Sequence, residues 1–207
     1  MFNVIKEKEK KLIVDNAHKR KKRPAVVRRT LIDEGIQLAL EHGLSAVTVQ
    51  AVADRAGVTK GGFLHHFPNK QSLIDTMFQE LLASIGQEWD AIIAVDPEPY
   101  GAFTRAYLES IMTMDWEDSV DRRAALSILM LNDRSLRQLW ADWFNTWLEK
   151  HQHSDGTLAL TLVRLAIDGL WLSELSGISL PNREQLYEQL RTATYPVISI
   201  TSGKHHE

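Results

Sequence analysis

Apolar residues recur at every third or fourth position along most of the chain, which is the spacing of an amphipathic helix. The first such segment, 24–43, opens on a proline and closes on a glycine, as helices often do. A second segment covers 49–57 and follows Thr48, a favourable N-cap residue. A third, 60–67, stops before Pro68, because a residue that precedes proline avoids the helical conformation. The pattern predicts a long helix, then two helices joined by a tight turn.

Helical periodicity continues through the rest of the chain. A long segment ends at Ala94 and is followed by VDPEPYG, in which two prolines mark a connection. The later helical segments are 101–114, 119–131, 134–151, 157–177 and 183–193. The sequence therefore predicts an all-α fold.

The stretch 57–70, GVTKGGFLHHFPNK, places two adjacent glycines and two adjacent histidines in the short helix. A phosphate-binding P-loop is excluded, because that motif needs a preceding strand and a different glycine spacing. His65 and His66 point about 100° apart on a helix and are poorly placed to chelate one metal ion. A helix-turn-helix remains. Gly61 and Gly62 each cost about 1 kcal/mol relative to alanine, and either a DNA groove or tight packing against another helix would account for them.

The string TVQAVADRAGVTKGGFLHHFPNKQSLID resembles the DNA-binding signature of the TetR family of bacterial repressors, over roughly residues 28–82. The rest of the chain is similar to the family in layout. The resemblance implies an N-terminal three-helix helix-turn-helix DNA-binding domain and a C-terminal helical ligand-binding and dimerisation domain. We expect a flexible basic arm over 1–23, the DNA-binding domain over 24–70, the ligand-binding and dimerisation domain over 71–198, and a tail over 199–207.

The resemblance also implies which residues contact DNA. Thr48 and Lys70 fall at helix N-termini, where such repressors hold DNA phosphates. Gln50 occupies a position that reaches a base or a phosphate in some members. The short helix would present its first residues to the major groove and its histidines toward the DNA backbone. The implied DNA-binding residues are Thr48, Gln50, Thr59, Lys60, Gly61, Gly62, His65, His66 and Lys70.

Two residues depart from the family pattern. Leu64 replaces a frequent tyrosine, and Gly62 replaces a frequent threonine, so the operator sequence cannot be carried over. Phe63, Leu64 and Phe67 are expected to pack in the core beside the first helix.

The charge of the chain is unevenly distributed. Residues 1–29 hold 11 Lys/Arg and 3 Asp/Glu, a balance of +8, and residues 30–207 hold 13 and 24, a balance of −11; together these give −3. A basic arm on an acidic body indicates a polyanion partner, and nucleic acid is favoured over membrane because the arm lacks a broad apolar face. A solvated tail is the alternative.

The segment 134–151 carries a broad apolar face rich in tryptophan. Ordinary core packing explains most of it, but flat apolar rings also suit the wall of a ligand cavity. The residues expected to line a pocket are Tyr107, Met112, Met114, Trp116, Trp140, Trp143 and Trp147. His151, His153 and Asp155 could bind a metal, but a solvated helix end is favoured, and we expect no metal and no cofactor.

The resemblance to the TetR family also implies that the last two helical segments pair with those of a second copy in a homodimer. A stripe of apolar and small residues suits a four-helix interface, in which Gly169 permits close approach. The expected interface residues are Leu162, Leu165, Gly169, Leu170 and Ser173. In a monomer the same stripe would finish the core.

These features favour a transcriptional regulator, in particular a repressor that an unidentified small-molecule effector releases from a palindromic operator in double-stranded DNA. The alternatives are a ligand-independent DNA-binding protein and, less favoured, an all-α enzyme. No nucleophile–base pair, metal triad or nucleotide loop is legible, so no enzyme is expected. The chain has no cysteine, no apolar run near the ~20 residues of a membrane span and no secretory signal, so we expect a cytoplasmic protein without a membrane partner.

Overall fold

The computed structural model describes residues 24–114, 130–131 and 133–196. Every regular element in these ranges is a helix, and the all-α fold predicted from the sequence is confirmed. The basic arm, Trp116, most of the expected 119–131 helix and the C-terminal tail lie outside the described residues. None of the helices in the described ranges is long and apolar enough to cross a membrane.

The chain divides into two compact units, Met1–Glu80 and Leu81–Glu207. Helix α4, Lys70–Val95, runs from the first unit into the second without a break. The domain limit expected at residue 70 falls at the first residue of this helix, and the proposed domain limits stay predictions.

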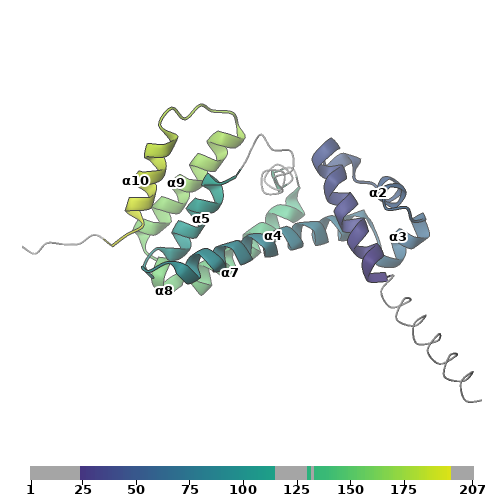
Figure 1. The fold of residues 1–207 in the computed structure, drawn as a ribbon, viewed down its shortest axis with the longest axis horizontal. Coiled ribbons are helices and arrows are strands. Elements are labelled where there is room, and N and C mark those ends of the chain that lie inside the picture. The colour runs from purple at the N-terminus through teal and green to yellow at the C-terminus, as the bar shows by residue number, and fades with distance from the viewer. Residues whose placement is uncertain (1–23, 115–129, 132, 197–207) are drawn as a thin grey trace, which may run out of the picture. The chain divides into compact units, whose positions relative to one another are not determined.

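The first unit consists of one long helix and several short ones, followed by the start of α4 (Figure 1). A helix over 24–42 is followed by the 3-10 helix η1 (Leu44–Ala46), α2 (Val49–Arg55), α3 (Lys60–His66) and the start of α4. These helices lie where the apolar pattern predicts them. Gly43 and Gly57, with φ of 78° and 66°, have left-handed backbone conformations directly after the helical turns that they close.

Threonine side chains determine where α2 and α3 begin. Oγ1 of Thr48 accepts a hydrogen bond from the backbone N–H of Ala51 at 3.1 Å, and Oγ1 of Thr59 accepts one from Gly62 at 3.0 Å. Each bond satisfies an N–H group that the first helical turn leaves open. Inward-facing residues of these helices build one core: Leu31, Ile32, Val47, Val52, Ala53, Phe63, Phe67 and Leu73.

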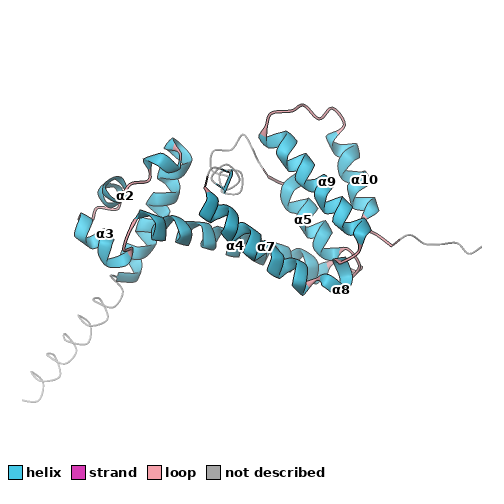
Figure 2. Ribbon diagram, turned by 180° about the vertical axis from the view of Figure 1, so that it is seen from behind, coloured by secondary structure: helices cyan, strands magenta, loops and turns pink. Residues whose placement is uncertain are grey.

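The second unit holds the remaining helices (Figures 1 and 2). After α4 come α5 (Ala102–Met112), α7 (Arg134–Lys150), α8 (Gln152–Asp155), α9 (Leu158–Leu175) and α10 (Arg183–Ala193). Nearly every residue of α5 is buried, because this helix packs against α8, α9 and α10. α5 is therefore the central helix of the unit.

An aromatic cluster joins α4, α5 and α7. Trp89 of α4 is 1% exposed, and its ring lies 5.5 Å from Phe103 and 5.2 Å from Trp147, measured between ring centroids. Gly86 allows α4 to approach α7 closely, since an added Cβ would lie 3.2 Å from Cζ2 of Trp147. Most tryptophans of α7 therefore take part in core packing.

A buried polar network replaces the solvated helix end expected near His151. Asp155 is 2% exposed, and its Oδ1 accepts hydrogen bonds from the backbone N–H and the hydroxyl of Thr104, at 2.8 and 2.7 Å. Arg164 donates to the Thr104 hydroxyl and to the Asp155 carbonyl. His151 stacks on Phe103, so burial lowers its pKa. The solvated-end interpretation was wrong for His151 and Asp155, because they pack against α5, whereas His153 is exposed as that interpretation expects. Among the described residues no group of three His, Asp or Glu could hold a metal.

The VDPEPYG connection is held by Arg105. Its Nε donates to Asp96 at 2.6 Å, and its Nη1 donates to the carbonyls of Tyr100 and Thr194. Gly101 has φ of 75°, and an added Cβ would lie 2.2 Å from the Thr194 carbonyl oxygen. The end of α10 is thereby joined to the start of α5.

Candidate nucleic-acid interface and ligand cavity

The first half of α3 is exposed and faces away from the core of its unit. Thr59, Lys60 and Gly61 are exposed, whereas Phe63 and Phe67, one helical turn apart, are 0% and 2% exposed. Leu64 was expected in the core, but it is 42% exposed. The expectation was wrong because positions 63 and 67 already form the inward face, and position 64 lies about 100° around the helix.

The two glycines of α3 have no structural explanation within the described residues. A Cβ added to Gly61 would meet only Oγ1 of Thr59, at 3.8 Å, and one added to Gly62 would lie 3.4 Å from Cβ of Val58. Neither glycine has a positive φ. Tight packing against another helix, one of the two explanations that the sequence left open, therefore does not apply here. The backbone is open to solvent at Gly61 and half-buried at Gly62.

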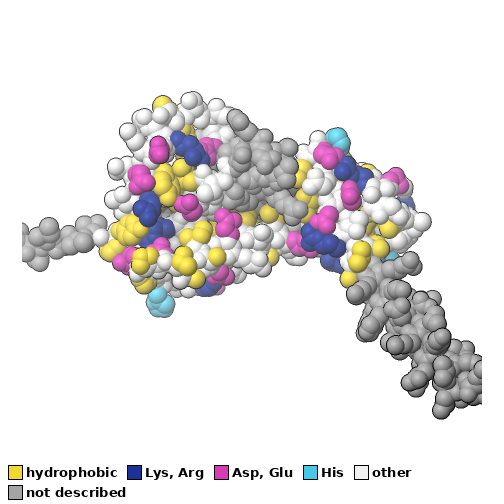
Figure 3. Space-filling view, viewed as in Figure 1, with side chains coloured by type: hydrophobic (Ala, Val, Ile, Leu, Met, Phe, Trp, Pro, Cys, Tyr) yellow, Lys and Arg dark blue, Asp and Glu magenta, His cyan; other side chains and the backbone are white. Residues whose placement is uncertain are grey.

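Lys60 is the cation at the start of this exposed surface, and it makes no hydrogen bond or ion pair with the described residues. The two arginines nearby in the fold behave differently. Arg29 pairs with Asp33 and Glu80, and Arg55 pairs with Glu34 and Glu41. Basic and acidic side chains accordingly lie side by side on the visible face of this unit (Figure 3). Arg29 and Arg55 are committed to internal ion pairs, so they are less available to an external anion than Lys60 and the exposed Arg28, whose guanidinium lies over the Phe67 ring.

His66 of α3 contributes little positive charge to this surface. Its pKa is lowered, first by partial burial and then by the nearby His65 and Arg28. The two imidazole rings lie 5.1 Å apart, edge to face. His66 is therefore mainly neutral near pH 7 and acts as a hydrogen-bonding group.

The other predicted DNA-contact residues also have internal roles. Lys70 donates from Nζ to the carbonyl of Leu44 at 3.1 Å, which ties the start of α4 to η1. Gln50 donates from Nε2 to Asp54 at 2.7 Å. The Thr48 hydroxyl accepts the α2 capping bond, which leaves its O–H free to donate. Thr48 and Lys70 remain at helix N-termini, where anions are favoured.

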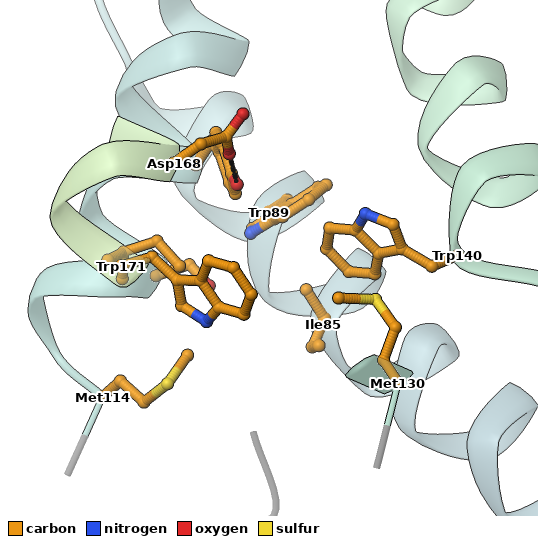
Figure 4. A pocket seen from close by; sticks show the side chains of 10 residues that line it. Ile85, Trp89, Met114, Met130, Trp140, Asp168 and Trp171 are labelled. Carbon is orange, nitrogen blue, oxygen red and sulfur yellow. Dashed lines mark hydrogen bonds between the residues drawn. The ribbon is translucent and has the colours of Figure 1, made fainter. Parts of the chain in front are cut away.

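The second unit contains a cavity of about 290 Å³, which Figure 4 shows from close by. Its lining comes from α4, α5, α7, α9 and the residues at the edges of the undescribed segment. The lining residues are Ile85, Trp89, Tyr107, Ser110, Ile111, Met114, Met130, Trp140, Asp168 and Trp171.

The predicted pocket residues divide between this cavity and the core. Tyr107, Met114 and Trp140 line the cavity, whereas Met112, Trp143 and Trp147 do not, and Trp116 lies outside the described residues. Trp147 is 7% exposed and stacks on Phe103, with ring centroids 5.8 Å apart. The prediction failed for it because it packs into the aromatic core.

Sequence reasoning missed the contribution of α9 to this cavity. Asp168 and Trp171 lie in RLAIDGLWLSEL, which was interpreted as an interface helix. A carboxylate and an indole in the largely apolar middle of this helix were the available signal. Tyr107 donates a hydrogen bond from its hydroxyl to Oδ1 of Asp168. Burial raises the pKa of Asp168, although the Tyr107 hydrogen bond and Arg164 act in the opposite direction.

The outer face of α9 is apolar and exposed. Leu158, Leu162, Leu165 and Leu172 are 75%, 58%, 61% and 49% exposed, and an added Cβ on Gly169 would meet nothing within 4 Å. These positions follow the three- and four-residue steps of one helical stripe. Two other predicted interface residues differ. Leu170 is 6% exposed inside its own unit, which corrects that assignment, and Ser173 donates its hydroxyl to the Gly169 carbonyl.

Comparison with known proteins relates both units to one family. The family described as "Bacterial regulatory proteins, tetR family" matches residues 31–77, and "Tetracyclin repressor-like, C-terminal domain" matches residues 101–195. The HTH-type transcriptional repressor KstR2 of Rhodococcus jostii is 32% identical over 130 residues, which cover 55% of this chain and 61% of that repressor.

Solved structures share the fold. A transcriptional regulator from Streptomyces coelicolor A3(2) is similar with a TM-score of 0.65 and 18% identity, over 82% of this chain and 99% of that one. The multidrug binding protein EbrR, in complex with malachite green, is similar with a TM-score of 0.65 and 17% identity, over 82% and 98% of the two chains. At these identities the likeness establishes the fold alone.

Proposed function

Because the chain belongs to the TetR family of bacterial transcriptional regulators, we propose that it is a repressor that binds a palindromic DNA operator as a homodimer and is released by a small molecule. The family and the relatives named above are transcriptional regulators rather than enzymes. The observation that carries the proposal is the exposed start of α3, where Lys60 and two glycines have no internal role.

This surface suits the major groove of DNA. Lys60 can donate to the O6 and N7 acceptors of guanine, and Thr59 can contact a thymine methyl group. The bare backbone at Gly61 and Gly62 lets α3 lie deeper in the groove than a helix with side chains at these positions. Thr48 and Lys70 would hold phosphates at the N-termini of α2 and α4, and Gln50, His65 and His66 would flank them.

The cavity of the second unit provides the site for an effector. Helix α4 contributes Ile85 and Trp89 to its lining and begins at Lys70 in the first unit. A ligand that moves these two side chains can therefore shift the start of α4 and, with it, η1. The solved structures of EbrR contain malachite green and ethidium, which supports a ligand-binding role for this fold. DNA affinity would change by the ligand's differential affinity for the two states.

The α9 stripe supports a homodimer. Exposed leucines at Leu158, Leu162, Leu165 and Leu172, with Gly169 between them, would be buried against the same stripe of a second copy. Dimers of helix-turn-helix proteins place their recognition helices about 34–36 Å apart. A palindromic operator follows from this symmetry.

The test is selection of genomic DNA fragments by the purified full-length protein at near-physiological salt. We expect a palindromic motif, and Lys60→Ala should weaken binding to it by about tenfold to a hundredfold, because a specific base contact contributes roughly 1–3 kcal/mol. Lys150→Ala is the matched control, since Lys150 lies in the second unit and pairs with Asp90. Recovery of fragments without a motif, or equal effects of the two variants, would refute the proposal.

A further inference from the structure

The cavity of the second unit has an unusual chemical composition. Asp168 is the one formally charged residue among those that line it in the described part of the chain, and no lysine or arginine takes part. The nearby Arg164 is held elsewhere, because it donates to Thr104, to the Asp155 carbonyl and to Thr161. Arg164 still acts on Asp168 through its charge, but it does not line the cavity. A carboxylate ligand or a phosphate ester would therefore meet Asp168 with no lysine or arginine beside it in the described lining, which disfavours acidic ligands there.

Aromatic rings form much of the remaining wall. Figure 4 shows the indole rings of Trp89, Trp140 and Trp171 around the same space as Asp168. The face of an indole ring is electron-rich and attracts a cation within about 6 Å, and the attraction grows when water is excluded. Met114 and Met130 add polarizable, adaptable apolar surface. The walls thus suit a flat apolar body that carries positive charge.

Trp89 also offers a hydrogen bond that the described chain does not use. Its Nε1 is buried and has no hydrogen-bond partner in the structure. In Figure 4 this nitrogen lies on the side of the ring turned toward Trp171. A buried donor without a partner costs about 1–3 kcal/mol. A ligand that carries a hydrogen-bond acceptor next to its own ring could accept the Trp89 N–H and so remove this penalty. The described residues do not supply such an acceptor.

We propose that this cavity binds a compact aromatic organic cation, whose charged nitrogen faces Asp168, whose ring lies among Trp89, Trp140 and Trp171, and whose acceptor atom receives the Trp89 N–H. This inference rests on the proposed function only in taking the cavity as the effector site. The hydrogen bond from Tyr107 positions the Asp168 carboxylate at the cavity. Partial burial raises the pKa of Asp168, and a cation beside it would favour its charged form, although the residue also keeps a surface open to solvent.

Three small molecules of nearly equal shape test the proposal by calorimetry on the full-length protein. Choline phenyl ether carries a ring, an ether oxygen and a quaternary ammonium. In 3,3-dimethylbutyl phenyl ether a carbon replaces the charged nitrogen, and in (3-phenylpropyl)trimethylammonium a methylene replaces the ether oxygen. We expect choline phenyl ether to bind about tenfold or more tightly than the neutral molecule, and several-fold more tightly than the compound without the oxygen.

Protein variants assign the two contacts. Asp168→Asn should abolish the preference for the cation, whereas Asp142→Asn, on the exposed side of α7, should leave it unchanged. Trp89→Phe should abolish the preference for the ether oxygen, and Trp143→Phe, in the same aromatic cluster but outside the lining, should preserve it. Because Trp89 is buried, the same comparison of probes is made within each variant, so that loss of stability does not imitate loss of a contact.

The outcomes separate the ligand class from the proposed function. Equal binding of the charged and neutral molecules, or no binding of any at millimolar concentration, would overturn the ligand class, even if the protein selects a DNA motif. Binding of the cation in the predicted order, with operator affinity unchanged, would support the ligand class and contradict release by a small molecule. Binding that weakens operator affinity would support both.

Discussion

At the scale of single residues, the glycines of α3 have the clearest functional meaning. Glycine is needed at Gly101, where φ is positive and a Cβ would collide with the Thr194 carbonyl. It is not needed at Gly61, where φ is ordinary and the surrounding space is open. Glycine here lowers helix stability without serving the fold, and we propose that close approach to a DNA groove is the reason for it.

Gly61→Ala should therefore change stability and DNA affinity in opposite directions. Alanine in place of an exposed helical glycine should raise the free energy of unfolding by up to about 1 kcal/mol. The added methyl group on the groove-facing backbone should weaken operator binding by roughly tenfold. Urea unfolding and a DNA titration on the same preparation measure both. A variant that is more stable and binds the operator as well as wild type would remove the groove explanation.

At the scale of helices, the sequence predicts where a helix lies better than which face it buries. The helix starts at Thr48 and Thr59 were predictable, because capping is local chemistry within one turn. The buried face of α9 was harder to predict, because this helix carries apolar residues on most of its faces. Leu170 points into the core and Leu165 to the outside, and only the packing of α5 against α9 decides between them. Asp168 and Trp171 were missed for the same reason.

The exposed stripe of α9 predicts a variant that separates the dimer. Leu165→Glu places a charge where a leucine would be buried, and each copy loses about 1.5–3 kcal/mol of apolar burial. Sedimentation equilibrium at micromolar concentration should show a shift from dimer to monomer. Val95→Glu is the control, because Val95 is 81% exposed at the end of α4, away from the stripe. A dimer that survives Leu165→Glu would place the interface elsewhere.

The connection before α5 should make stability depend on acid pH. Burial raises the pKa of Asp96, but hydrogen bonds from Arg105 and from the backbone N–H of Glu98 outweigh it, so the net pKa lies below the ordinary value of 3.8. A carboxyl with a lower pKa in the folded state stabilises the fold above its unfolded pKa, and this contribution is lost as pH falls below about 4.

Asp96→Asn should therefore be less stable than wild type at pH 7, and the difference should shrink as pH falls below about 4. Unfolding in urea at a series of pH values measures this. The exposed Asp142 provides the comparison as Asp142→Asn. A difference that stays constant from pH 7 to pH 3 would show that Asp96 does not supply this part of the stability.

At the scale of the whole molecule, the proposed regulation requires two units that share helix α4. The local motif could be predicted from the sequence, because its signature lies within 50 consecutive residues or so, and its helices were found where expected. The cavity could be predicted only in part. Its walls come from four helices far apart in the sequence, and Tyr107, Met114 and Trp140 are the members whose role periodicity indicated. The other tryptophans of α7 pack in the core, which no local pattern reveals.

In the proposed mechanism, two copies of α3, held by a homodimer, read two half-sites on one face of DNA. The most direct measurement is the affinity of the full-length protein for its selected operator and for the same operator with about five base pairs, half a helical turn, inserted between the half-sites. We predict a loss of affinity to the level of unrelated DNA, because the insertion turns one half-site to the opposite face. Unchanged affinity would contradict paired recognition by a dimer.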